Sequence, residues 1–457
     1  MMETEKGRKP KVLFVSLGCD KNLADSEAML GLLTDQGYTF TDDESEAEVI
    51  VVNTCCFIGD AKEESIQTIL EMARQKSCGR CKALVATGCL AQRYSEEILE
   101  DIPELDGILG TTAYDQIVTL IEEALEGKKP RRFQSVDRLV PDQGKRVVTT
   151  GGHYAYLKIA EGCDKHCTYC VIPKVRGNYR SVPMEQLVQD GQALAERGVR
   201  ELILVAQETT VYGTDLYGKK MLPELLRRLA GIPGIYWIRL LYCYPEEITD
   251  ELIEVIAAEK KVCHYLDMPV QHASDAILKR MGRRTSRQGL LDMIEKLRGR
   301  IPDIALRTTL LTGFPGETEE DFQTLYEFAD MAGFERLGVF AYSPEEGTPA
   351  FSYPDQVPEE VKESRRDRLM ELQQEIAFDT CQDQIGRILT VMIEGKVADE
   401  AAYVGRTYMD APGVDGYIFV QTGEILVTGD FVTVKVTGAV DYDLIGEIYD
   451  EFDESAE

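Results

Sequence analysis

The sequence has no apolar run approaching the roughly 20 residues that a membrane-spanning helix needs. Its start, MMETEKGRKPK, is polar with no apolar stretch behind it, so we expect no signal peptide and a cytoplasmic location. Positive charge is also scarce, because 50 Lys and Arg stand against 80 Asp and Glu, a formal net charge of −30. Such a chain repels nucleic-acid phosphates and favours a basic partner, although solubility alone explains a global acidic excess equally well.

The twelve cysteines lack the context of disulfides, since clustered thiols in a long chain without a secretory signal more often bind metal. Cys163, Cys167 and Cys170 form C-x₃-C-x₂-C, and no second Cys or His pair follows to complete the four closed ligands of structural zinc. Three thiolates at this spacing can hold three irons of a [4Fe–4S] cube and leave the fourth iron open to a small molecule. The pattern therefore favours an iron–sulfur cluster over zinc or unpaired thiols.

Residues 11–127 alternate strand and helix patterns. The strings KVLFVSLG, EVIVVNTC and KALVATGC read as buried parallel strands, and Ser26–Asp35 and Ala61–Arg74 carry apolar residues at helical spacing. This alternation predicts a doubly wound α/β domain, in which ligands gather at the carboxyl ends of the strands. A second cluster with an open iron is therefore expected there, unless these thiols are only small core hydrophobes. Each strand ends in one of three cysteines: Cys19, Cys55 and Cys89.

The remaining six cysteines carry weaker signals. Cys78 and Cys81 form a C-x-x-C in KSCGRCK, but a redox motif should open a helix and this one runs toward a strand. We therefore expect incidental thiols on a surface loop. The other four have no partner at ligand spacing and are expected in cores: Cys56, Cys243, Cys263 and Cys381.

A solvated linker is predicted over 128–153, followed by a second α/β block over 154–383. Strand and helix patterns alternate six times, which predicts a full or partial barrel with chemistry at the strand C-termini. Helical stretches such as Met184–Arg197 and Glu319–Met331 lie between the strands, and Pro358–Gln384 closes the block. The expected strands are Tyr154–Ala160, Glu201–Ala206, Tyr236–Leu241, Tyr265–Val270, Ala305–Thr312 and Arg336–Ala341.

Polar side chains follow several of these strands, and the cysteine loop follows the first. Gln207 and Glu208, Tyr244, and Gln271 with His272 stand at strand ends, and the turn GFPGE follows another strand. His272 is expected to be a hydrogen-bonded structural residue, which is the commoner role of a single histidine. Residues 384–457 contain only short β patterns and predict a small β domain with an acidic end, whose last residues are expected to be disordered.

These motifs together resemble a known family. CDKHCTYC after a first barrel strand is similar to the radical S-adenosylmethionine (SAM) superfamily, and SLGCDKNLADSE, VVNTC and TGCLAQ are similar to its methylthiotransferase family. The third block resembles the small β-barrel TRAM domain that ends these enzymes. The resemblance covers essentially the whole chain. It implies a flavodoxin-like N-terminal domain, a partial (β/α)₆ radical SAM barrel and a TRAM barrel.

Two branches of the family are open, one modifying ribosomal protein (RimO type) and one modifying tRNA adenosine (MiaB type). RLLYCYPEEI, YLDMPVQHASDAILKRMGR and FAYSPEEGTPA resemble the RimO type, and Gln271–His272 stands where the tRNA enzymes usually show Gln-Ser. Over 386–457 there are 4 Lys and Arg against 15 Asp and Glu, whereas a barrel that grips tRNA should be basic. The acidic end suits a basic protein substrate.

The resemblance implies two [4Fe–4S] clusters and SAM as cofactors. The core triad would bind and cleave SAM, and the resulting radical would take hydrogen from the β-carbon of an aspartate of small-subunit ribosomal protein S twelve. The N-terminal triad would present sulfur, and a second SAM would methylate it, giving 3-methylthioaspartate. The electron donor stays open, as does modification on or off the ribosome, and no membrane partner is expected.

Further roles are expected for a few polar residues. Gln207, Gln271 and Arg307 are candidates to hold SAM, with Arg307 as a bidentate fork for its carboxylate. Each could instead satisfy strand-end backbone groups. Lys174 and Arg176, just past the core triad, are candidates to steer the substrate aspartate. A noncatalytic RNA-binding or cluster-assembly protein is the alternative from another class, and two complete triads argue against it.

Overall fold

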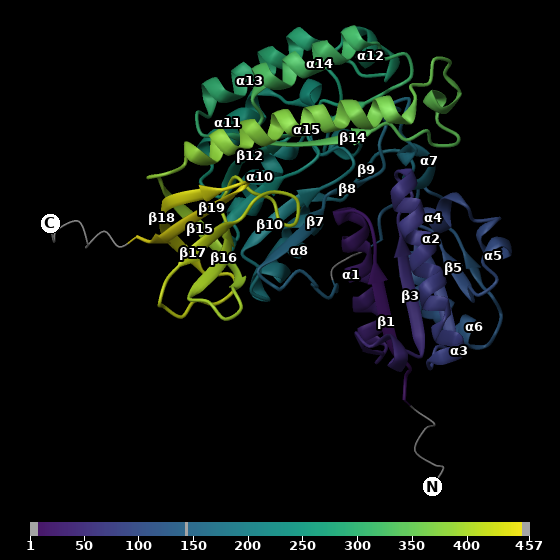
Figure 1. Ribbon diagram of the computed structural model, residues 1–457. Helices are drawn as coiled ribbons and strands as arrows, with labels where there is room; N and C mark the ends of the chain where they lie inside the picture. Colours follow the sequence, from purple (N-terminus) through teal and green to yellow (C-terminus); the bar gives the residue numbers. More distant parts are fainter. Residues whose placement is uncertain (1–7, 142–144, 450–457) are drawn as a thin grey trace.

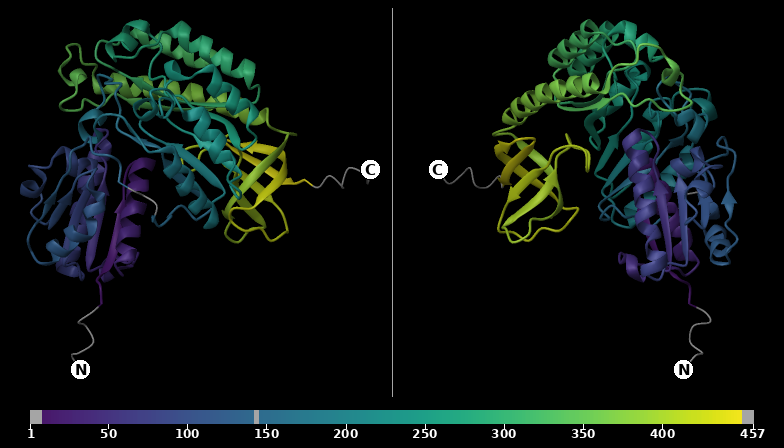
Figure 2. Two further views of the ribbon diagram at one scale, coloured as in Figure 1. Left: turned by 180° about the vertical axis from the view of Figure 1, so that it is seen from behind. Right: turned by 45° about the vertical axis from the view of Figure 1, so that its right-hand side comes forward.

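The computed structural model describes residues 8–141 and 145–449, which form three domains (Figure 1). The N-terminal domain and the C-terminal barrel both contact the central domain. Helices α11, α13 and α14 of the central domain run along the side away from both, as the further views also show (Figure 2). Among the helices of these two ranges, none is both long and apolar enough to cross a bilayer.

The N-terminal domain has one parallel sheet in the order β2-β1-β3-β4-β5-β6, with helices on both faces. The three predicted strands are confirmed as β1, β3 and β4, and every residue of β3 and β4 is buried. Three short strands, β2, β5 and β6, escape the sequence pattern because two or three residues carry no periodicity. The strands are β1 (Lys11–Ser16), β2 (Thr39–Phe40), β3 (Val49–Thr54), β4 (Ala83–Gly88), β5 (Gly107–Leu109) and β6 (Arg131–Arg132). The helices are α1 (Asp20–Asp35), α2 (Gly59–Ala73), α3 (Gln75–Cys78), α4 (Cys89–Arg93), α5 (Ile98–Asp101) and α6 (Ile117–Leu125), with 3₁₀ turns η1 (Glu44–Glu46) and η2 (Tyr114–Gln116).

The central domain has a second parallel sheet in the order β14-β13-β12-β11-β10-β7, which is the predicted partial (β/α)₆ barrel. All six strands lie where the sequence predicts them, although β12 begins and ends three residues early. The strands are β7 (Tyr154–Lys158), β10 (Glu201–Val205), β11 (Trp237–Leu240), β12 (Val262–Asp267), β13 (Ala305–Thr312) and β14 (Arg336–Ala341), with β8 (Ala160–Glu161) and β9 (Arg180–Ser181) forming a separate pair. The helices are α7 (Ile172–Arg176), α8 (Met184–Glu196), α9 (Thr214–Tyr217), α10 (Leu222–Ala230), α11 (Asp250–Ala258), α12 (Asp275–Arg280), α13 (Arg287–Arg300), α14 (Glu319–Ala332) and α15 (Glu359–Gln382), with 3₁₀ turns η3 (Pro245–Glu247) and η4 (Pro349–Ser352).

The C-terminal domain is a closed five-stranded barrel in the order β15-β16-β17-β19-β18. Its strands are β15 (Ile388–Lys396), β16 (Ala402–Arg406), β17 (Ile418–Gln421), β18 (Phe431–Val440) and β19 (Asp443–Ile448). The disorder expected at the acidic end concerns residues 450–457, which lie outside the described residues.

The two faces of the central sheet have different neighbours because side chains alternate along each strand. In β10, Leu202 and Leu204 pack with the surrounding helices, whereas Ile203 and Val205 pack in a cluster shared with the C-terminal barrel. Glu201, at the start of β10, is fully buried and pairs with Arg239 of β11 (2.7 Å) and Arg406 of β16 (2.6 Å). The barrel therefore covers the inner face near the N-terminal ends of the strands and leaves the C-terminal ends to the N-terminal domain.

The predicted linker is solvated only in part, because several of its described residues pack against all three domains. Its residues 131–132 form β6 of the first sheet, and the backbone N–H of Thr149 donates to the buried carboxylate of Glu27 (2.7 Å). His153 is buried and lies 3.0 Å from Glu394 of the barrel. A basic, proline- and glycine-rich composition indicates the absence of a helix, but it does not show that the segment packs along other domains.

Candidate cluster sites

The three N-terminal cysteines lie at the carboxyl end of the first sheet. Cys19 precedes α1, Cys55 follows β3, and Cys89 opens α4. Gly18 has φ 85°, and a Cβ there would lie 2.7 Å from Cβ of Cys55, so only glycine allows the turns to approach this closely. Burial, followed by the neighbouring thiols of Cys89 and Cys19, raises the pKa of Cys55 to about 11.

The core triad occupies the loop after β8, at the C-terminal mouth of the partial barrel. Burial raises the pKa of Cys163 to about 12, and the thiol of Cys167 adds to the rise. The same two effects raise the pKa of Cys170, with Cys167 again as the neighbouring thiol. The three thiols therefore face one another in a largely desolvated loop.

The chemistry of both triads fits [4Fe–4S] clusters. All six thiols are free, and Cys56, next to Cys55, is a further buried thiol near Cys89. Across the described residues, no three Cys, His, Asp or Glu side chains are arranged to share a single metal ion. Three thiolates that each bind a different iron are the donor set of a [4Fe–4S] cube with one open iron, whereas structural zinc takes four closed ligands.

One short segment contacts both triads. Arg176, at the end of α7, donates from Nε to Sγ of Cys89 (3.4 Å), and the carbonyl of the next residue, Gly177, accepts the backbone N–H of Cys163 (3.1 Å). Gly177 has φ 75° and ψ −165°, a conformation that is open essentially only to glycine. The two candidate cluster sites are therefore linked through adjacent residues of one turn.

The guanidinium of Arg176 belongs to a buried ionic network between the first two domains. It pairs with Asp25 of α1 (2.7 Å) and Glu161 of β8 (3.0 Å), and it donates to Oδ1 of Asn22 (2.8 Å). Lys158, at the end of β7, pairs with the same two carboxylates. Two cations thus balance two anions, which burial requires of charged groups.

A second segment, Tyr242–Tyr244 after β11, also reaches both sites. The hydroxyl of Tyr244 lies 3.5 Å from Sγ of Cys167. The hydroxyl of Tyr242 donates to Asp20 (3.0 Å), the residue next to Cys19. Tyr242 has φ 61°, a strained value for an aromatic residue, and its N–H donates to Asp267 (2.9 Å). The pattern of polar residues after strands predicted a site position for Tyr244 but not for Tyr242.

The predicted SAM residues fall in different surroundings. Nε2 of Gln207 donates to Glu161 (2.7 Å), while its Oε1 is buried with no hydrogen-bond partner. Gln271 has φ 70° and bridges Leu310 of β13 through its backbone, and no hydrogen bond of its side-chain amide is found among the described residues. Arg307 lies five residues before the end of β13 and is not at a strand end. Its guanidinium lies 3.0 Å from Asp267 and 3.3 Å from Asp415 of the C-terminal barrel.

The structure corrects the steering role expected of Arg176, because its guanidinium is buried and fully engaged with protein anions. It also corrects the surface position expected of Cys81, which is 7% exposed and packs in the first domain's core, while Cys78 is exposed. Lys174 is exposed as expected. The other four unpaired cysteines are buried in cores: Cys56, Cys243, Cys263 and Cys381.

His272 and Glu208, two polar residues at the mouth, are both buried but have different partners. His272 is fully buried, its Nδ1 accepts from the N–H of Ser274 (2.9 Å), and its Nε2 lies 3.3 Å from Glu317, so the structural role is confirmed. Glu208 is buried with its carboxylate 3.7 Å from the Lys165 ammonium. Burial raises the pKa of Glu208 to about 7, against hydrogen bonds from Thr210 that lower it.

Family models match all three domains of the chain. "Uncharacterized protein family UPF0004" matches residues 11–110, "Radical SAM superfamily" matches 157–329, and "TRAM domain" matches 385–448. A solved structure of the radical S-adenosylmethionine methyltransferase TsrM from Kitasatospora setae, with cobalamin and a [4Fe-4S] cluster bound, shares the fold. Its TM-score is 0.54 at 14% identity, covering 75% of this chain and 77% of that one.

Curated relatives extend over nearly the whole chain. The chain is 63% identical to the ribosomal protein uS12 methylthiotransferase RimO of Lachnoclostridium phytofermentans, over 95% of this chain and 99% of that protein. It is 51% identical to the protein of the same name from Acetivibrio thermocellus, over 97% of this chain and 99% of that protein.

Proposed function

The chain belongs to the RimO family of ribosomal protein uS12 methylthiotransferases, and from this premise we propose which of its residues carry the reaction. It is a radical SAM enzyme that methylthiolates the β-carbon of an aspartate in uS12, the protein called S twelve above. The assignment of sites rests on one observation: Arg176 and Gly177, adjacent in the chain, hydrogen-bond to a cysteine of each triad. The tRNA-modifying alternative has no comparable support, and a cytoplasmic location follows for an enzyme whose target is ribosomal.

The enzyme uses SAM and two [4Fe–4S] clusters, which supply reductive S–C cleavage at one site and sulfur at the other. Cys163, Cys167 and Cys170 would hold the cluster that meets SAM. The auxiliary cluster would be held by Cys19, Cys55 and Cys89. Water exclusion follows from the burial of Cys55, Cys89, Cys163 and Cys167, each no more than 8% exposed. Arg176 places a hydrogen bond and a positive charge on Cys89, an arrangement that would tune the reduction potential of a cluster held there.

Gln207 and Gln271 are the stronger of the proposed SAM contacts. Each stands at the mouth with an amide group whose hydrogen-bonding capacity is at least half unused by the described residues. The proposed role of Arg307 requires its guanidinium to leave Asp267 and Asp415, which is costly for a largely buried ion pair. Its present contacts suit anchoring of the C-terminal barrel.

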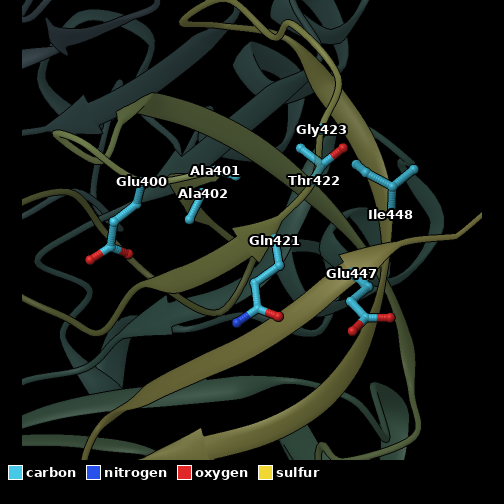
Figure 3. Close-up of a pocket in the computed structure, with 8 residues that line it drawn as sticks. All are labelled: Glu400, Ala401, Ala402, Gln421, Thr422, Gly423, Glu447 and Ile448. Atoms are coloured by element: carbon cyan, nitrogen blue, oxygen red, sulfur yellow. The ribbon is translucent and has the colours of Figure 1, made fainter.

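The C-terminal barrel offers a docking surface for the basic substrate protein. Residues 386–449 contain ten Asp and Glu and four Lys and Arg. Three of the acids pair with buried cations: Glu394, Asp410 and Asp415. The acids left at the surface still outnumber the three surface bases. An open hollow on the barrel is lined by Glu400, Gln421 and Glu447, whose side chains point in the same direction in Figure 3. Beside it, Ile425 is 93% exposed.

Two cysteine substitutions test the assignment of the triads. Cys163→Ala should abolish reductive SAM cleavage, measured as 5′-deoxyadenosine by mass spectrometry. Cys55→Ala should keep that cleavage but stop methylthiolation of a uS12 peptide. Cys56→Ala is the matched control, since that thiol is adjacent and buried yet outside the triad. Persistent cleavage by Cys163→Ala, or wild-type product formation by Cys55→Ala, would contradict the assignment.

The docking surface predicts a salt-dependent interaction. Affinity for uS12 should fall steeply as salt rises, because charges at a surface are screened over about 10 Å at 0.1 M. Glu400→Gln combined with Glu447→Gln should weaken binding and flatten the salt dependence in fluorescence anisotropy. Glu122→Gln, on the N-terminal domain, serves as the control. A salt-independent affinity would show that uS12 docks elsewhere.

A further inference from the structure

Lys21 is a buried cation with no anionic partner within residues 8–141 and 145–449. It is 6% exposed, and its ammonium lies 3.2 Å from the centroid of the Tyr242 ring. Within the described ranges, no ion pair or hydrogen bond of this ammonium is found. The other two buried lysines both have carboxylates, since Lys158 pairs with two acids of the ionic network and Lys362 pairs with Glu359 (2.8 Å).

The position of Lys21 makes a missing anion costly. It is the second residue of α1, where the helix dipole disfavours a cation. Burial disfavours the charge further, and the face of an aromatic ring compensates only in part. The carboxylate of the adjacent Asp20 accepts the hydroxyl of Tyr242 (3.0 Å) and forms no ion pair with Lys21 among the described residues.

The same position lies between the two candidate clusters. Lys21 is two residues from Cys19, and Tyr242, which covers its ammonium, is two residues from Tyr244 beside Cys167. A substrate carbon that receives sulfur from one site and loses hydrogen at the other must come to this boundary. Tyr242 adopts its positive φ at this point, with its ring facing the cation.

We propose that Lys21 binds the side-chain carboxylate of the substrate aspartate and so selects aspartate as the residue to be modified. The inference rests on the proposed function. The ion pair orients the β-carbon, which is bonded directly to that carboxylate, toward the boundary between the sites. SAM also carries a carboxylate, but Lys21 stands beside the auxiliary triad and not the triad assigned to SAM.

Lys21→Met tests the proposal through binding. The probes are uS12 peptides carrying Asp, or Asn in its place, added to the reconstituted enzyme without reductant. Wild-type enzyme should prefer the Asp peptide, and Lys21→Met should lose about 10- to 100-fold affinity for it while binding the Asn peptide as before. Lys21→Arg should keep most of the preference. Lys260→Met is the matched control, an exposed lysine just before β12, at the end of the central sheet opposite the mouth.

Two further readouts separate this role from a structural one. Lys21→Met should raise thermal stability without substrate, because it removes an unpaired buried charge, and iron content and SAM affinity should stay unchanged. A retained Asp preference in Lys21→Met, an equal loss for both peptides, or a loss of SAM affinity would overturn the proposal. If wild-type enzyme cleaves SAM but neither binds nor modifies the Asp peptide, the proposed function itself fails.

Discussion

Replacing Arg176 with Met should loosen the N-terminal domain from the core and disturb the auxiliary site. The side chain bridges the two domains, since Asp25 and Asn22 belong to the first and Glu161 to the second. Methionine keeps much of the length but removes the charge. Of the two buried cations described in this network, Lys158 alone would then remain beside the two carboxylates.

The size of the effect follows from that imbalance. Removing one partner of a buried ion pair costs about 3–5 kcal/mol, because an uncompensated charge stays in a low-dielectric interior. The cost applies to the docked arrangement, since separated domains would expose the carboxylates to water. The free energy of opening the interface should fall by this amount, so opening becomes roughly 100- to 5,000-fold more frequent.

Hydrogen exchange measured by mass spectrometry reports this opening. Amides of α1 and of β7 should exchange faster in Arg176→Met by that factor, while those of α11 and α13, far from the interface, should keep wild-type rates. Arg80→Met is the control, an exposed arginine in the same sequence block as the N-terminal sheet. The absorbance of the auxiliary cluster should also change, since Cys89 loses a hydrogen bond. Unchanged exchange in α1 and β7 would refute the idea that the buried network holds the domains together.

Three further substitutions test other parts of the structure. Glu201→Gln leaves the buried Arg239 without a carboxylate and Arg406 with Glu394 alone, and should cost about 3–5 kcal/mol, seen as a lower urea midpoint, with the exposed Glu424→Gln as control; a change under about 1 kcal/mol would contradict the expectation. The pKa of Glu208 is raised to about 7, so the folded state holds a proton that the unfolded state has lost, and stability falls as pH rises from about 4.5 through 7. Glu208→Gln should therefore gain about 1 kcal/mol on wild type between about pH 6 and 8.5, and a constant difference across that range would argue against the raised pKa. Gly177→Ala would place Cβ 2.5 Å from the carbonyl oxygen of Val136 in a glycine-only conformation, and should cost about 1–3 kcal/mol and lower iron content per chain, whereas Gly299→Ala, with open space around it, should not.

Much of the fold and both cysteine triads could be predicted from local patterns in the sequence. The six strands of the central sheet and the three long strands of the first one are readable because burial on both faces demands continuous apolar runs. Cys163, Cys167 and Cys170 are close in sequence, so their spacing alone indicates shared ligation. Cys19, Cys55 and Cys89 could be grouped although far apart, because parallel strands bring their carboxyl ends to one edge.

Tertiary structure decided which distant charges meet. Arg176 reads from sequence as a free cation beside the core triad, but domain docking places it against Asp25 and removes it from any role in steering substrate. Arg307 reads as a strand-end fork, but the C-terminal barrel brings Asp415 to it. No pattern in the sequence singles out Lys21. Its unusual position appears only in the structure, where its ammonium faces the ring of Tyr242 and not a carboxylate. Spacing and periodicity describe neighbours along one element, whereas the partner of a buried charge depends on how separate domains pack, and only the folded chain fixes that.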